Sequence, residues 1–166
     1  MPNVQLIVPS RAVEDALNND PEYKAAMSSG DWPRLANAVQ RVLAGTPLTA
    51  SLDARDPWGG YLAVDEETHE VVGSCAFKTP PTTGGTVEIA YFTYPQFEGR
   101  GYATEMARKL VELATQAGTV LSIVAHTLPE TSASTRVLEK AGLELVAEVS
   151  HPEDGPVWRW HRRVGK

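Results

Sequence analysis

The stretch from Tyr94 to Glu105, which reads YPQFEGRGYATE, constrains the fold more than any other part of this 166-residue chain. A strand pattern ends where the stretch begins, and a helical pattern follows it. Gly99 and Gly101 flank Arg100, and glycine allows backbone conformations in which amide groups surround an anion. We interpret the stretch as a phosphate-binding loop at a strand-to-helix junction, with a simple glycine turn as the alternative.

Two familiar nucleotide-binding loops do not match this stretch. A dinucleotide-binding loop has a third glycine where this chain has Thr104, and it follows an N-terminal βαβ unit. A P-loop ends in Gly-Lys-Ser or Gly-Lys-Thr, and neither triplet occurs in the sequence. What remains is a helix N-terminus whose free amides, from Arg100 to Thr104, carry partial positive charge and suit a pyrophosphate.

Hydrophobic periodicity predicts a single domain over residues 1–166, which is enough chain for one well-buried core. Ser10 is expected to cap the first helix, and Thr131 or Ser132 the last one. The second, third and fourth strands are expected to form an antiparallel meander. Strands are predicted at 4–8, 61–64, 71–77, 87–94, 120–125, 143–149 and 157–163. Two or three short helices are predicted before Gly45, the first at 11–18, the next around 21–27 and then one that Asp31 can cap. Two later helices are predicted, one from about 103 to 116 and one that ends before Gly142.

Composition and charge exclude several classes of function. The formal net charge is -6, which gives no electrostatic basis for binding nucleic acid. The apolar runs are far shorter than the roughly 20 residues that span a bilayer, so no membrane segment is expected. Cys75 is the single cysteine and the N-terminus lacks a signal-peptide pattern, which favours a cytoplasmic location. No group of residues has metal-ligand spacing, so no metal is predicted.

Two blocks of the sequence resemble one known family. The pattern Gln96-x-x-Gly99-x-Gly101, continuing YATE, looks like the acyl-CoA signature of the GNAT acetyltransferase superfamily. A second block, residues 127–143 with the sequence TLPETSASTRVLEKAGL, resembles a later helix of its ribosomal-protein N-terminal acetyltransferase branch. The resemblance implies an α+β, single-domain GNAT fold with a mixed, mostly antiparallel sheet of about seven strands flanked by about four helices.

The resemblance also implies a reaction and a cofactor site. The chain is expected to move an acetyl group from acetyl-CoA to a primary amine, by direct attack in a ternary complex, as a monomer or homodimer. The amine acceptor is a small molecule or a protein N-terminus, and Trp32 and residues 151–158 are expected to shape its pocket. The predicted strand at 87–94 is expected to bulge near its end and to splay from the next strand. Backbone groups around Phe92 to Tyr94 could then pair with the pantetheine arm and hold the acetyl oxygen. Cofactor-binding residues are predicted to be Phe92, Thr93, Tyr94, Gln96, Gly99, Arg100, Gly101, Tyr102, Ala103, Thr104, Thr131 and Ser134.

Candidate catalytic residues flank the glycine stretch. Glu88 lies on the opposite strand face from its apolar neighbours and is the candidate general base, acting through a water, unless it is merely an exposed carboxylate. Ser134 matches the family serine that protonates the leaving thiolate, although a capping or exposed serine fits equally. Tyr94 is the next candidate proton donor, with Tyr91 and Tyr102 as further hydroxyls. His126, at the end of its strand, either binds substrate or water or is a satisfied strand-end histidine.

The chain departs from the family pattern at three positions. Thr131 stands where the branch usually has Asn, Ala90 stands in a Glu-Ile-Gly-Tyr pattern, and Leu138 stands where many members have a catalytic tyrosine. These departures keep open a second hypothesis, a module that binds an acyl-CoA without catalysis. A nicotinamide-dependent oxidoreductase is a third hypothesis, which would be stabilised by NADH and not by CoA.

Overall fold

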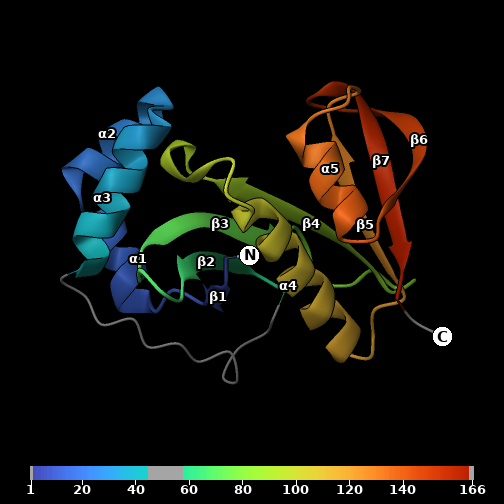
Figure 1. Ribbon diagram of the computed structural model, residues 1–166, viewed down its shortest axis with the longest axis horizontal. Helices are drawn as coiled ribbons and strands as arrows, with labels where there is room; N and C mark the ends of the chain where they lie inside the picture. The colour runs from blue at the N-terminus through green and yellow to red at the C-terminus, as the bar shows by residue number, and fades with distance from the viewer. Residues whose placement is uncertain (1, 45–57, 165–166) are drawn as a thin grey trace.

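The computed structural model describes residues 2–44 and 58–164, which form one seven-stranded sheet with helices packed on it (Figure 1). The strand order is β1-β2-β3-β4-β5-β7-β6, and only β4 and β5 run parallel. The predicted mixed sheet is confirmed, with five α-helices where about four were expected. The elements are β1 Val4–Ile7, α1 Arg11–Asn18, α2 Pro21–Ser29, α3 Trp32–Ala44, β2 Gly60–Asp65, β3 Val71–Phe77, β4 Thr86–Thr93, the 3-10 helix η1 Pro95–Phe97, α4 Tyr102–Gln116, β5 Ser122–Thr127, α5 Ala133–Lys140, β6 Glu144–His151 and β7 Gly155–Arg163.

Side chains at the helix starts explain where several helices begin. The Ser10 side chain accepts a hydrogen bond from the Val13 amide, as predicted for α1. At α5, Ser132 and Thr135 form a reciprocal capping box, so Ser132 and not Thr131 is the cap. These caps pair amides that a helix leaves without internal partners, and they fix where α1 and α5 start.

Helix α4 contributes a row of buried apolar residues to the core. Its residues Met106, Ala107, Leu110 and Ala114 are fully buried and recur at helical spacing. In Figure 1, α4 crosses in front of the strands, α1 to α3 gather at one end, and α5 lies in front of β5. Within the described ranges, every helix falls short of the length and apolarity needed to cross a bilayer.

Strands β4 and β5 separate soon after they meet. They pair only over Thr86–Glu88 and Ser122–Val124, although β4 continues to Thr93 and β5 to Thr127. Figure 1 shows the two parts of the sheet diverging there. The pairing therefore opens a gap in the middle of the sheet, directly after Glu88.

On the edge opposite β5, strand β4 stays in register with β3 along its whole length. Lys78 N donates to Glu88 O and Tyr94 N to Val72 O, each at 2.9 Å, with no register shift between them. The expected bulge near the end of β4 is therefore absent from this pairing. In an antiparallel pair, every second residue of a strand directs its backbone N–H and C=O groups toward the same neighbour. Glu88 and Tyr94 bond to β3, so the backbone groups of Tyr91 and Thr93 point the other way, into the gap.

A buried hydrogen bond ties the start of α4 to the turn after β2. The Tyr102 hydroxyl donates to Asp65 Oδ2 at 2.5 Å, while the amides of Glu67 and Thr68 donate to Asp65 Oδ1. The Tyr102 bond, aided by the two amides, lowers the pKa of Asp65 in spite of its burial. Tyr102 thus anchors the glycine stretch to the body of the sheet.

We expect Tyr102→Phe to lower the free energy of unfolding by about 1.5–3 kcal/mol, the usual contribution of a hydrogen bond to a charged group. Because the pKa of Asp65 is lowered by folding, its contribution is present above the unfolded value of about 3.9 and is lost as the pH falls through the folded value. Urea unfolding at pH 7 and pH 3 should therefore show a difference between variant and wild type that narrows in acid.

Tyr23→Phe is the matched control for this measurement, because the Tyr23 hydroxyl makes no hydrogen bond to another residue in the described ranges. A difference for Tyr102→Phe that is no larger than that of the control would contradict the anchoring role.

Candidate active site

A cleft of about 790 Å³ opens between the end of β4, the start of α4 and the exposed side of α5. We call it the α4–α5 cleft. Eight of the twelve predicted cofactor-binding residues line it, from both motif blocks. Its lining comprises Tyr91, Phe92, Thr93, Phe97, Glu98, Gly99, Gly101, Tyr102, Ala103, Thr104, Ala133, Ser134, Arg136, Val137 and Lys140.

The helix start in this cleft has the features of an anion site. Gly101 is the N-cap of α4 at a φ of 92°, a conformation that favours glycine, and no side chain caps the helix there. The first amides of α4 are therefore left for a ligand or water. Across the cleft, Arg136 and Lys140 are the cations in the described lining, beside the single carboxylate of Glu98. This arrangement suits phosphate oxygens.

The floor of the cleft contains unpaired polar groups. Thr93 Oγ1 is the one buried side-chain oxygen or nitrogen, among the described residues, that lacks a hydrogen-bond partner. Beside it, the backbone groups of Tyr91 and Thr93 face the gap where β5 has left β4. Buried polar groups are nearly always hydrogen-bonded in folded proteins, so these groups fit a ligand with amide-like partners.

Two residues of the glycine signature point away from the cleft. The Arg100 guanidinium lies 5.7 Å from the centre of the Phe97 ring, and Arg100 lines a separate hollow beside α3. The Gln96 side chain donates to the carbonyl of Pro33 at 3.0 Å. Their side chains therefore hold the loop against α3, and positive charge reaches the cleft from α5.

Two other predicted cofactor residues also lie outside the cleft lining. Tyr94 is buried with its ring 5.9 Å from Phe92, and burial raises the pKa of Tyr94 to about 12. Thr131 is exposed and precedes the capping residue of α5. The structure does not bring either side chain to the site, including Tyr94 as a proton donor.

Sequence reasoning missed the two cations of α5. Arg136 and Lys140 are four residues apart, so they share a helix face, and Ser134 lies two residues before Arg136. The spacing was visible in the second motif block. The sequence did not predict that this face of α5 lies opposite the start of α4.

A second space, which we call the splay cavity, occupies about 230 Å³ where β4 and β5 diverge. Glu88 Oε2 lies 3.1 Å from His126 Nδ1 and 3.0 Å from Lys78 Nζ. Burial raises the pKa of Glu88, but the hydrogen bonds and charges of His126 and Lys78 outweigh it, so the pKa is lowered. Glu88 is therefore an ionised, half-buried carboxylate at neutral pH.

Tyr91 and Ser134 join the splay cavity to the α4–α5 cleft, because both residues line both spaces. The Tyr91 hydroxyl donates to the Ser134 carbonyl at 3.2 Å. Burial raises the pKa of Tyr91 to about 12, and this hydrogen bond only partly offsets it. The Ser134 side chain is exposed, and its hydroxyl makes no hydrogen bond within the described part of the chain.

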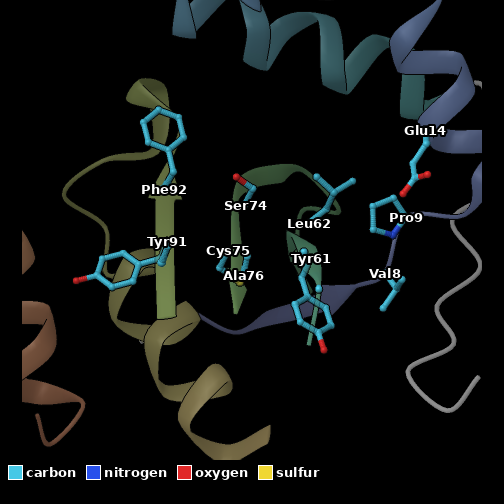
Figure 2. A pocket seen from close by; sticks show the side chains of 13 residues that line it. Val8, Pro9, Glu14, Tyr61, Leu62, Ser74, Cys75, Ala76, Tyr91 and Phe92 are labelled. Carbon is cyan, nitrogen blue, oxygen red and sulfur yellow. The ribbon is translucent and has the colours of Figure 1, made fainter. Parts of the chain in front are cut away.

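A third space, the lateral cavity, occupies about 460 Å³ beneath α1 (Figure 2). Figure 2 shows Tyr91 and Phe92 on one side of it and the Glu14 carboxylate on the other. Ala90 and Phe92 share the strand face opposite Tyr91, which places this cavity across the sheet from α5. Ala90 also lines the splay cavity, so the two spaces adjoin.

Glu14 is the one charged residue in the described lining of the lateral cavity, and no ion pair joins it to another described residue. The remaining lining is mostly apolar backbone and side chains of β2, β3 and β4. Within residues 2–44 and 58–164, no group of His, Cys, Asp or Glu side chains is arranged to hold a metal ion.

Comparisons with known proteins identify similar sequences and similar folds. The uncharacterized N-acetyltransferase YjdG of Bacillus subtilis (strain 168) is 25% identical over 118 residues, which are 71% of this chain and 70% of that protein. The solved structure of RimL, a ribosomal L7/L12 alpha-N-protein acetyltransferase in complex with coenzyme A, matches with a TM-score of 0.67 at 17% identity, covering 98% of this chain and 94% of that one.

A spermidine N-acetyltransferase SpeG chimera from Vibrio cholerae and hSSAT matches with a TM-score of 0.64 at 11% identity, covering 97% and 95% of the two chains. At such identities the solved structures show the fold alone. The model of the acetyltransferase (GNAT) domain matches residues 9–144, which is most of the chain and includes both motif blocks. The chain therefore belongs to the GNAT acetyltransferase family.

Proposed function

We propose that this member of the GNAT family transfers an acetyl group from acetyl-CoA to a primary amine by direct attack within a ternary complex. The observation that carries the proposal is the gap after Glu88, which opens to the α4–α5 cleft on one side and to the splay and lateral cavities on the other. A donor and an acceptor can therefore meet across the sheet without leaving the protein.

The α4–α5 cleft fits the donor. The uncapped start of α4, with Arg136 and Lys140 opposite, suits the phosphates of coenzyme A. The backbone groups of Tyr91 and Thr93 suit the amides of its arm, which would extend the sheet as an added strand does. Acetyl-CoA supplies a thioester, and RimL, which shares the fold, is described in complex with coenzyme A.

The groups around the gap match the tasks of the reaction. An ammonium must lose a proton before its nitrogen can attack, and the Glu88 and His126 pair lies in the splay cavity. Ser134 lines both the splay cavity and the α4–α5 cleft, so its hydroxyl is the candidate proton donor for the leaving thiolate. Neither the Thr131 nor the Leu138 departure removes these groups.

Direct attack is also supported by the chemistry of Cys75, the single cysteine. A covalent acyl-enzyme through cysteine requires a thiolate. Burial raises the pKa of Cys75 to about 12, so its thiol remains protonated at neutral pH. The lateral cavity that Cys75 helps to line is consequently suited to holding an acceptor and not to forming an acyl-enzyme.

The acceptor is best explained as a small amine that enters through the lateral cavity. Its volume lies in the range of small-molecule sites, and the carboxylate of Glu14, which forms no ion pair with another described residue, lies at its rim. A second positive charge on the acceptor would be complementary to Glu14. The SpeG chimera, named a spermidine N-acetyltransferase, is an example of this fold with a polyamine acceptor and supports this choice, whereas RimL, named for a ribosomal protein, represents the other acceptor class.

We expect Arg136→Gln to weaken coenzyme A binding about tenfold or more, since it removes a charge-assisted bond to phosphate. Isothermal titration calorimetry at two salt concentrations measures this loss. Lys24→Gln, an exposed lysine on α2, is the charge-matched control and should bind normally. Equal affinity in wild type and Arg136→Gln would contradict the assignment of the α4–α5 cleft.

We expect wild-type protein to release free thiol from acetyl-CoA with small amines, fastest with those carrying a second positive charge. In Glu14→Gln the KM for a diamine should rise roughly threefold to fivefold, because an exposed ion pair contributes up to about 1 kcal/mol. The KM for a monoamine should not change. A thiol-release assay with matched monoamines and diamines measures both.

Asp15→Asn removes the same charge from the neighbouring position of α1, outside the cavity lining, and is the control. If both variants change KM alike, the effect belongs to the overall charge and not to the lateral cavity. Coenzyme A binding without thiol release from any amine or peptide would instead favour the non-catalytic module.

A further inference from the structure

We propose that His126 takes the proton from the acceptor amine, and that Glu88 is the residue that positions the imidazole for this task. The inference rests on the proposed N-acetyltransferase function and deepens it. The sequence alone predicted Glu88 as the base and left His126 as a substrate-binding, water-ordering or satisfied residue. The contacts between the two side chains lead to a different division of roles.

The hydrogen bond between them determines which imidazole nitrogen is free. An ionised carboxylate only accepts hydrogen bonds, so the 3.1 Å contact places the hydrogen of a neutral ring on His126 Nδ1. The lone pair is then on Nε2. Nε2 makes no hydrogen bond to another residue in the described ranges, and His126 lines the splay cavity. A basic nitrogen is thus presented where the amine must arrive.

Lys78 makes Glu88 the poorer of the two proton acceptors. Its Nζ lies 3.0 Å from the same Oε2 that contacts His126. A proton on this carboxylate would weaken an ion pair and a hydrogen bond together, which agrees with the lowered pKa of Glu88. The same carboxylate, held ionised, stabilises an imidazolium beside it. Glu88 is therefore suited to orient and support His126.

Charged and titratable groups from several elements lie around His126. Glu88 makes the direct hydrogen bond, whereas the others act at longer range through charge. Carboxylates favour the imidazolium and cations oppose it. The groups are Lys78 after β3, Glu88 on β4, Glu130 in the loop after β5, His151 at the end of β6 with its ring 6.4 Å away, and Arg159, the cross-strand partner on β7.

The transfer conserves protons and electrons. An ammonium acceptor gives one proton to His126 Nε2 and becomes a neutral amine. Its nitrogen lone pair forms the N–C bond to the acetyl carbon, and the C–S bond breaks with its electron pair on sulfur. The surplus proton on nitrogen passes by way of the Ser134 hydroxyl to the sulfur, and His126 returns its proton to solvent.

The test compares kcat/KM across pH in wild type, His126→Gln and Glu88→Gln. A free imidazole titrates near about 6.5 and a glutamate carboxyl near about 4.3. We expect His126→Gln to lower kcat about 10²-fold to 10³-fold and to abolish the acidic limb that protonation of an imidazole base produces. Glu88→Gln should lower kcat less and keep that limb, because the imidazole remains as the base. His161→Gln, an imidazole on β7 outside the cavities, is the control and should resemble wild type.

A second readout does not depend on turnover. In the unliganded protein, ring ¹⁵N NMR shifts should place the hydrogen of the neutral His126 ring on Nδ1 in wild type and in His161→Gln, whereas Glu88→Ala, which removes the acceptor, should lose this preference. An unchanged Nδ1 preference in Glu88→Ala would overturn the positioning role. Loss of the acidic limb in Glu88→Gln, with near wild-type rates in His126→Gln, would overturn the base assignment. Wild-type protein that acetylates no amine would instead contradict the proposed function itself.

Discussion

The short parallel pairing of β4 with β5 is the constraint on which the site depends. Because this pairing ends at Glu88 and Val124, the next backbone groups of β4 that face β5 have no strand as a partner on that side. On its other edge β4 remains bonded to β3, and a Cβ atom at Gly73 would overlap the carbonyl of Phe92. Glycine at that position therefore lets β4 hold to β3 while it departs from β5.

The two faces of the gap have different chemistry. On the α4–α5 side lie helix amides and the cations of α5, which suit an anionic donor. On the opposite face, Glu14 and the largely apolar lateral cavity suit a cationic amine. Tyr102 contributes to the stability of the fold as well as to the donor side of the gap, since its buried hydrogen bond to Asp65 holds the start of α4 against the sheet. The same residue therefore serves the fold and the shape of the cleft.

Much of this architecture follows from the sequence, because strand and helix periods are local properties. The Ser10 cap, the meander and the glycine turn at Gly101 were all predictable from neighbouring residues. The directions of individual side chains were harder to predict. Arg100 was expected beside the phosphates but stacks over Phe97, since the turn directs its side chain toward α3.

Contacts between segments that are distant in the sequence could not be predicted from local patterns. Arg136 and Lys140 reach the cleft only because α5 packs beside α4, and Lys78 meets Glu88 across a strand pair. The expected bulge is replaced by a regular β3–β4 ladder with a separated β5. The separation of β4 from β5 was expected from the family resemblance, whereas the packing of α5 beside α4 is a tertiary fact that no local window of sequence records.

The central claim is that the free edge of β4 beyond Glu88 binds the coenzyme A arm. Residue-resolved amide hydrogen exchange with saturating coenzyme A tests it most directly. Exchange at Tyr91 and Thr93, which face the gap, should slow on binding. Tyr94, whose amide is already bonded to Val72, should change little. Calorimetrically detected binding that leaves the Tyr91 and Thr93 amides exchanging at unchanged rates would contradict the account.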